Sequence, residues 1–215
     1  MFKEPVFKAR HSRSGKAVLP AIVLIIVMQI LFLMAMIANR QSILSSDIIV
    51  VLETRPIDPR SLFRGDYVRL KYDINNLQLD ELSGDRTFKI NDTVYVVLEQ
   101  NGPFWDAQGI YLQRPVLPES PANSPKKRRH VIRGVIKTVN NRHWSRDDKT
   151  VVDVTSLRVS YGIENYFVPE GEGLKLERPE PGDKVTLEVA LDKDGRAAIK
   201  TLLLNGVAQY QEALF

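Results

Sequence analysis

Two segments of the chain concentrate side chains that could form a polar binding site. In the first, arginine, aspartate and tyrosine side chains crowd into residues 60–69, and in the second, carboxylates flank a tyrosine within residues 164–172. If the two segments pack side by side, they would form a polar cleft rimmed with tyrosine, suited to a peptide edge, a sugar or a loop of another protein. The candidate binding residues are Arg60, Arg64, Asp66, Tyr67 and Arg69 in the first segment and Glu164, Tyr166, Glu170 and Glu172 in the second.

The same segments offer two groupings that would support hydrolysis. A serine becomes a nucleophile when a nearby lysine with a lowered pKa removes its proton, and Ser61 with Lys71 is the obvious pair. Lys71, however, falls on the polar face of its predicted strand, where it would be solvated and charged. Two carboxylates that meet in space can cleave a glycosidic bond, and Asp66 with Glu164 is the candidate pair. An envelope hydrolase acting on peptide or glycan is therefore the alternative to a binding function.

Residue types that hold metals and cofactors are scarce and scattered. The chain has no cysteine, which excludes disulfides, thiolate metal ligands and cysteine nucleophiles. Its three histidines, His11, His130 and His143, include no H-x-x-x-H pair. The glycines at positions 171 and 173 are not followed by a helical pattern, so they do not predict a phosphate-binding loop. We therefore expect neither a metal nor a cofactor.

The segment Gly65-Asp-Tyr-Val-Arg-Leu-Lys-Tyr72 has a structural interpretation of its own. Gly65 permits a tight turn, and Asp66 can accept a backbone N–H across it. Hydrophobic and polar side chains then alternate as far as residue 74, which is typical of a strand with one buried face. Leu70 and Tyr72 fall on the buried face, whereas Tyr67 falls on the opposite face. We expect a structural role for this segment first and a binding role second.

These eight residues match every defined position of the pattern G-D-Y-x-x-L-x-Y, and the chain therefore resembles the GDYXXLXY family. The lead-in at residues 55–64 and a second block at residues 161–171 also look like parts of that family's pattern. The resemblance extends over residues 48–206. It implies a bacterial, membrane-anchored protein of unassigned biochemical function, often accompanying a multi-spanning membrane protein. It carries over no catalytic residue.

The elements that must position these residues have the pattern of a mainly β domain. Short β-branched or alternating runs recur about every ten residues, separated by turn-forming residues, and no long 3.6-residue period is present. Asp194-Gly195 lies between two such runs and predicts a hairpin. We therefore predict a small barrel- or sandwich-like domain over residues 47–215. Strands are expected at residues 47–55, 67–74, 90–99, 109–114, 131–139, 150–160, 181–190 and 197–204, a short helical turn within 76–87, and a disordered proline-rich basic loop at 115–130.

An uncharged apolar segment at residues 17–38 precedes this domain. A helix of that length covers about 33 Å, enough to cross a hydrocarbon core of about 30 Å. The segment is longer than the apolar core of a cleaved signal peptide, and its end lacks the small residues of a cleavage site, so we expect a retained transmembrane helix. Gln29, its only strongly polar residue, is expected to mark a contact with another membrane helix. An amide bonded to its own backbone is the alternative.

The flanking charges predict how this helix crosses the membrane. Residues 1–16 carry five basic residues and one acidic residue, whereas Arg40 alone follows the apolar segment closely. The positive-inside rule places this tail in the cytoplasm and the β domain on the outer, periplasmic side of a bacterial cytoplasmic membrane, with residues 39–46 as a polar linker. Most of the net charge of +4 lies in the tail, which indicates contact with anionic lipid rather than with nucleic acid.

These features favour a binding or assembly module over an enzyme. The chain would act outside the cytoplasm as an accessory subunit of a multi-spanning membrane protein, and the lipid bilayer would be its second partner. The motivating features are the retained anchor, Gln29 and the lack of a catalytic constellation in the sequence.

Overall fold

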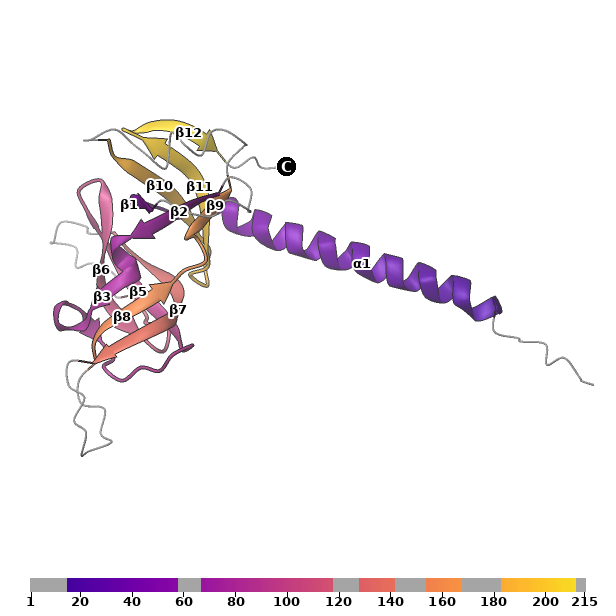
Figure 1. Cartoon of the computed structure of the whole chain (residues 1–215), viewed down its shortest axis with the longest axis horizontal. Coiled ribbons are helices and arrows are strands. Elements are labelled where there is room, and N and C mark those ends of the chain that lie inside the picture. Colours follow the sequence, from indigo (N-terminus) through magenta and orange to yellow (C-terminus); the bar gives the residue numbers. More distant parts are fainter. Residues whose placement is uncertain (1–14, 58–66, 118–127, 142–153, 168–182, 212–215) are drawn as a thin grey trace, which may run out of the picture. The chain divides into compact units, whose positions relative to one another are not determined.

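The computed structural model describes residues 15–57, 67–117, 128–141, 154–167 and 183–211, which are coloured in Figure 1. This part of the chain contains one long helix followed by short strands. The prediction of a mainly β protein preceded by a single apolar helix is therefore confirmed. The chain divides into two compact units, Met1–Arg40, which holds most of the helix, and Gln41–Phe215, which holds the strands.

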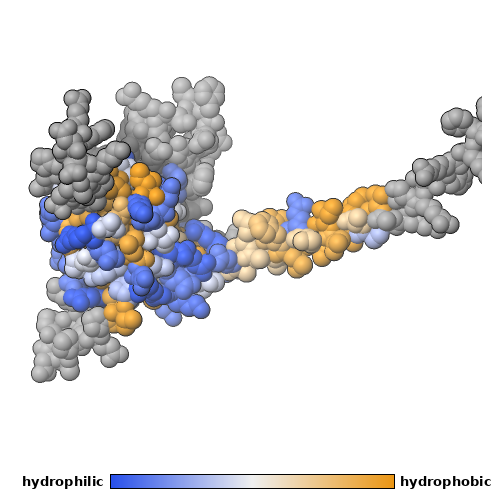
Figure 2. Space-filling model, turned by 90° about the horizontal axis from the view of Figure 1, so that it is seen from below, coloured by the Kyte–Doolittle hydropathy of each residue, from blue (hydrophilic) through white to orange (hydrophobic). Residues whose placement is uncertain are grey.

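Helix α1 (Gly15–Leu44) contains the whole apolar segment. Every side chain from Val18 to Ile37 is exposed, and Figure 2 shows their hydrophobic surface along the helix. The helix is long and apolar enough to cross a membrane. Because apolar surface is unfavourable in water, this helix needs an apolar environment that its own chain does not supply among the described residues.

The last turn of α1 belongs to the second unit. Ile43 and Leu44 are buried and pack with Ala198 of the sheet. Just beyond the helix, the Ser46 hydroxyl donates a hydrogen bond to the Leu191 carbonyl at 2.5 Å. The polar linker expected at residues 39–46 is therefore helical as far as Leu44, because continuing the helix buries two large apolar side chains against the sheet.

The first sheet is antiparallel throughout and has the described strand order β12-β11-β10-β1-β2-β9 (Figure 1). Strand β1 lies between β10 and β2, so the start and the end of the domain meet in the middle of this sheet. The β10–β11 hairpin confirms the turn predicted at Asp194-Gly195. The strands are β1 (Ile49–Ile57), β2 (Tyr67–Tyr72), β9 (Asn165–Phe167), β10 (Val185–Leu191), β11 (Ala197–Leu204) and β12 (Val207–Gln211).

The second sheet has the described strand order β3-β8-β7-β5-β6-β4. Its pairs are antiparallel except for the short parallel pair of β4 with β6. The helical turn predicted within residues 76–87 is the 3-10 turn η2, and a second such turn, η1, directly follows β2. The elements are η1 (Asp73–Asn75), β3 (Asn76–Gln78), η2 (Leu79–Glu81), β4 (Ser83–Gly84), β5 (Thr93–Asn101), β6 (Phe104–Tyr111), β7 (Arg129–Asn141) and β8 (Val154–Ser160).

Both sheets contribute to one hydrophobic core. Alternate residues point inward, as a strand with one buried face requires; examples are Val50 and Leu52 on β1. The predicted buried face of the motif strand is confirmed at Leu70 and Tyr72, whereas Lys71 between them is exposed. Burial of Leu70 and Tyr72 therefore decides which face of β2 points into the core.

Some predicted boundaries differ from the observed ones. Strand β6 begins at Phe104 rather than near residue 109, because a turn at residues 102–103 brings it back beside β5. Strand β7 begins at Arg129, so His130 lies in a strand and not in the disordered loop predicted at 115–130. Residues 118–127 of that loop lie outside the described residues. The strands β3, β4, β9 and β12 were too short to show a hydrophobic period in the sequence.

Candidate functional site

Strand β2 pairs with β9, and this pairing brings the two predicted segments side by side. Arg69 lies opposite Asn165, and Val68 lies opposite Tyr166. The backbone N–H of Leu70 extends the contact by donating to the Glu164 carbonyl at 2.9 Å. Among the described residues, β2 and β9 are therefore neighbours at the end of the first sheet.

Two buried tyrosines form hydrogen bonds between the loop that precedes β9 and the segment made of β2 and η1. The Tyr72 hydroxyl donates to the Ile163 carbonyl at 2.6 Å, and the Tyr161 hydroxyl donates to the Ile74 carbonyl at 2.7 Å. Burial raises the pKa of both tyrosines well above the ordinary value, and the nearby Glu164 carboxylate raises the pKa further. Both phenols therefore remain protonated near neutral pH and act as hydrogen-bond donors.

The Glu164 carboxylate accepts four hydrogen bonds from groups around it. Two come from the backbone of its own loop, from Tyr161 N at 2.5 Å and Gly162 N at 3.0 Å. The others come from the Ser160 hydroxyl at 3.0 Å and from the Asn75 side-chain amide at 3.2 Å. A carboxylate engaged in this way satisfies backbone donors that would otherwise lack a partner. These hydrogen bonds stabilise the conformation of the loop between β8 and β9.

Asn75 connects this carboxylate to the motif strand. Its side-chain oxygen accepts from Tyr72 N at 2.7 Å, and its side-chain nitrogen donates to the Val159 carbonyl at 2.9 Å as well as to Glu164. Asn75 was not predicted from the sequence, because it lies between the strand predicted to end at residue 74 and the helical turn predicted within 76–87. We call the set Tyr72, Asn75, Ser160, Tyr161 and Glu164 the motif network.

The structure describes some of the predicted binding residues, whereas others lie outside the described part of the chain. Tyr67 and Arg69 lie in β2 and Tyr166 lies in β9, each described by its backbone alone. Glu164 is part of the motif network. Their role in binding remains a prediction. The predicted residues that lie outside the described residues are Arg60, Arg64, Gly65 and Asp66 in the first segment and Glu170 and Glu172 in the second.

The described residues give no support to the hydrolase alternative. Lys71 is exposed on the outer face of β2, and the Glu164 carboxylate is engaged by its four donors. Ser61 and Asp66, the other members of the two candidate pairs, lie outside the described residues. Within the described part of the chain, no group of three histidine or carboxylate side chains is arranged to hold a metal ion.

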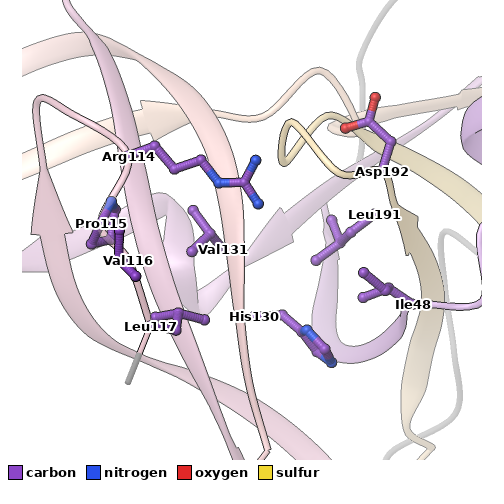
Figure 3. A pocket seen from close by; sticks show the side chains of 9 residues that line it. All are labelled: Ile48, Arg114, Pro115, Val116, Leu117, His130, Val131, Leu191 and Asp192. Atoms are coloured by element: carbon purple, nitrogen blue, oxygen red, sulfur yellow. The ribbon is translucent and has the colours of Figure 1, made fainter. Parts of the chain in front are cut away.

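A cavity of about 300 Å³ was not predicted from the sequence (Figure 3). It lies where Ile48, the β6–β7 loop, the start of β7 and the end of β10 meet, and His130 lines it. The imidazole stacks on Trp105, with ring centroids 5.0 Å apart. Burial lowers the pKa of His130, and the neighbouring Arg128 lowers it further. The lowered pKa favours the neutral imidazole.

Comparison with known proteins gives one match. A family model described as GDYXXLXY protein matches residues 29–202, which include the end of α1, the motif strand and the whole motif network. No curated protein and no solved structure matches the chain. The family match covers well over half of the 215 residues. The chain belongs to the GDYXXLXY family.

Proposed function

We propose that this protein is a membrane-anchored binding and assembly module that serves as an accessory subunit of an integral membrane protein. The observation that carries the proposal is the exposed apolar surface of α1, which is continuous from Val18 to Ile37. Removing such surface from water is worth about 25 cal/mol per Å². A bilayer and the helices of a membrane partner are the environments that would supply this gain.

The asymmetry of charge supports one orientation of the anchor. The basic tail before α1 would remain in the cytoplasm, and the β domain would lie on the periplasmic side. Fusions of the full chain to alkaline phosphatase or to green fluorescent protein at the C-terminus test this. Phosphatase activity with little fluorescence is expected, and the reverse pattern would contradict the orientation.

Gln29 supports contact between α1 and another membrane helix. Its amide lies near the middle of the apolar segment, where lipid offers it no hydrogen-bond partner. Interhelical hydrogen bonds of this kind contribute about 0.6–2 kcal/mol. We therefore propose that Gln29 lies on the face of α1 that meets the partner.

Co-purification of the full chain from membranes in mild detergent tests the proposal. A membrane protein is expected to accompany the wild-type chain, and Gln29→Leu is expected to reduce its yield severalfold, because the amide contact is lost. Leu31→Ala is the control, since two residues along a helix place it on nearly the opposite side. Recovery of the chain alone, both before and after chemical crosslinking, would overturn the proposal.

The motif strand supports a second contact in the periplasmic part. The motif network fixes the backbone where β2 and β9 pair, and Tyr67 and Arg69, two residues apart on β2, are the proposed binding residues for this contact. Arg69→Glu is expected to weaken co-purification of the partner, whereas Lys71→Glu, the same change on the same strand, is expected to have little effect. Equal losses from both variants would argue against a specific contact at Arg69.

A further inference from the structure

The cavity beside His130 is small, and its lining combines apolar residues with three polar ones, Arg114, His130 and Asp192. Ile48, Val131 and Leu191 line it on the side of the sheets, and Pro115, Val116 and Leu117 line it on the side of the β6–β7 loop (Figure 3). Its volume of about 300 Å³ is at the lower end of the range for small-molecule sites. A site of that size accepts a headgroup-sized ligand rather than a whole lipid.

Two polar side chains in this cavity are suited to an anion. The Arg114 guanidinium extends into the space, as Figure 3 shows, and binds the Lys193 carbonyl through one of its five N–H donors. The His130 imidazole makes no hydrogen bond to another residue in the described part of the chain, although it stacks on Trp105. A neutral imidazole and a guanidinium can both donate to phosphate oxygens.

The other charges near the cavity also favour a negative ligand. Asp192 lines it, but its carboxylate accepts from Arg196 Nε at 2.6 Å, so this negative charge is already paired. Arg128, whose charge acts on His130, adds to the positive potential. The local surplus of positive charge therefore complements an anion rather than a cation or a neutral sugar.

The cavity lies close along the chain to the end of the membrane helix. Ile48 follows Leu44, the last residue of α1, by four residues, and at most about 14 Å of extended chain joins them. Leu191 N donates to the Ile48 carbonyl at 2.9 Å, so the end of β10 is held beside Ile48 in the same wall of the cavity. Residues 39–44 continue the helix beyond the apolar segment and add about 9 Å to its length. This length is similar to the thickness of the headgroup layer of a bilayer.

An exposed apolar side chain at the rim is consistent with a membrane surface. Val116, in the β6–β7 loop, is 94% exposed, although it carries no polar group. It follows Arg114 by two residues in the same loop, and a basic residue close to an exposed apolar one is a combination that binds the interface of an anionic bilayer.

We propose that this cavity binds the phosphate headgroup of an anionic phospholipid, with Arg114 and His130 as donors to the phosphate. The inference rests on the proposal that α1 spans a membrane, and it adds a specific lipid contact to that anchor. Phosphatidylglycerol, which has one net negative charge, and phosphatidylcholine, which has none, separate a charge-specific site from general contact with lipid.

The test uses the full chain in nanodiscs, in which phosphatidylglycerol replaces phosphatidylcholine stepwise while NMR follows the His130 imidazole. A saturable shift of the His130 resonance is expected with phosphatidylglycerol, together with a rise in the His130 pKa, because a bound anion favours the imidazolium. Arg114→Ala is expected to weaken this response about tenfold, which corresponds to one charge-assisted hydrogen bond. Lys137→Ala, which removes an exposed charge from β7 outside the cavity, is expected to leave the response unchanged.

Several outcomes would overturn the lipid site. An identical response to both lipids, or equal losses in the two variants, would show nonspecific surface charge. A response to glycerol phosphate in phosphatidylcholine discs, with no preference for phosphatidylglycerol, would assign the cavity to a soluble ligand. A response only to the co-purified membrane protein would assign it to that partner. In each case co-purification itself is unaffected, so the proposed accessory function is judged separately.

Discussion

Glu164, one of the predicted binding residues, is engaged by hydrogen bonds within the protein. From its position in the second block it was expected to supply an acidic wall for a cleft. In the structure it accepts from two backbone N–H groups, a serine and Asn75, and so holds the turn before β9. Charge-assisted bonds of this type are among the stronger hydrogen bonds in proteins.

Replacement of Glu164 should therefore affect stability. In Glu164→Gln, the amide nitrogen faces donors that need an acceptor, so we expect the free energy of unfolding to fall by about 2–3 kcal/mol. Urea denaturation of the full chain in mild detergent measures this change. Glu81→Gln removes an exposed carboxylate and serves as the control. A similar small loss in both variants would show that the four hydrogen bonds do not contribute to stability.

Asp192 should make stability depend on pH in the acid range. Burial raises its pKa, but hydrogen bonds from Arg196 and from Asp194 N outweigh this effect and hold the pKa below its ordinary value of 3.8. The contribution of Asp192 to folding is thus complete above pH 3.8 and is lost as the pH falls through the folded-state pKa. Asp192→Asn should remove that part of the acid sensitivity in urea titrations from neutral pH down to about pH 2.

The matched variant for this experiment is Asp73→Asn, which removes an exposed carboxylate. Its stability should follow the same pH curve as the wild type. If Asp192→Asn retains the wild-type acid sensitivity, other carboxylates are responsible for it.

Among the secondary-structure elements, the β10–β11 hairpin shows how two sheets are connected through backbone contact. Gly195 has φ of 78°, and its carbonyl accepts from Arg133 N of strand β7 at 2.7 Å. A hairpin of the first sheet thereby adds a hydrogen bond to a strand of the second sheet. The turn must combine a left-handed backbone with close approach, and glycine meets both requirements.

Gly195→Ala should therefore lower the free energy of unfolding by more than the strain of the left-handed backbone conformation alone. The left-handed backbone costs about 1–2 kcal/mol for alanine. In addition, the new methyl group would lie 2.9 Å from the Val131 carbonyl oxygen, so backbone must move. Gly206→Ala separates the two effects, because Gly206 also has φ of 78° but has no atom within 4 Å of the added methyl. Equal losses of unfolding free energy in the two variants would exclude a contribution from the contact.

On the scale of the whole molecule, the apolar helix α1 continues to the start of the β domain, with only residues 45–48 between it and strand β1. The helix extends to Leu44, and its last turn is buried with the sheet at Ala198. A displacement of this last turn would therefore disturb the packing of β11. This connection suits the accessory role proposed above, in which the folded domain would respond to a membrane partner.

Membrane retention should depend on the middle of the apolar segment. Val27→Arg places a charge near its centre, at a cost of about 2.5–3.5 kcal/mol on insertion scales, and we expect a measurable fraction of the chain to be lost from alkali-washed membranes. Ser42→Arg puts the same side chain at an exposed position in the last turn of α1 and should be retained like the wild type. Full retention of both variants would show that the helix is not the sole anchor.

The sequence by itself was sufficient for features that depend on neighbouring residues. The uncharged run at residues 17–38 predicts a helix suited to a bilayer, alternation predicts the buried face of β2, and Asp194-Gly195 predicts a hairpin. Each of these rests on local geometry, in which side chains a few residues apart share a face. The family resemblance was also present in the local pattern at residues 65–72.

Only the tertiary structure decided which residues from distant segments of the chain come into contact. Asn75 and Glu164 are 89 residues apart in the sequence, and their hydrogen bond depends on which strands pair. His130 and Ile48 line one cavity for the same reason. The fold brings β7, which contains His130, close to the end of β10, and Leu191 of β10 is hydrogen-bonded to Ile48. A single sequence specifies the faces of its strands but carries little information on strand partners, since many pairings would bury the same apolar area. Thus the apolar helix and the β class followed from the sequence, whereas the hydrogen bonds of Glu164 and the cavity at His130 followed from strand pairing.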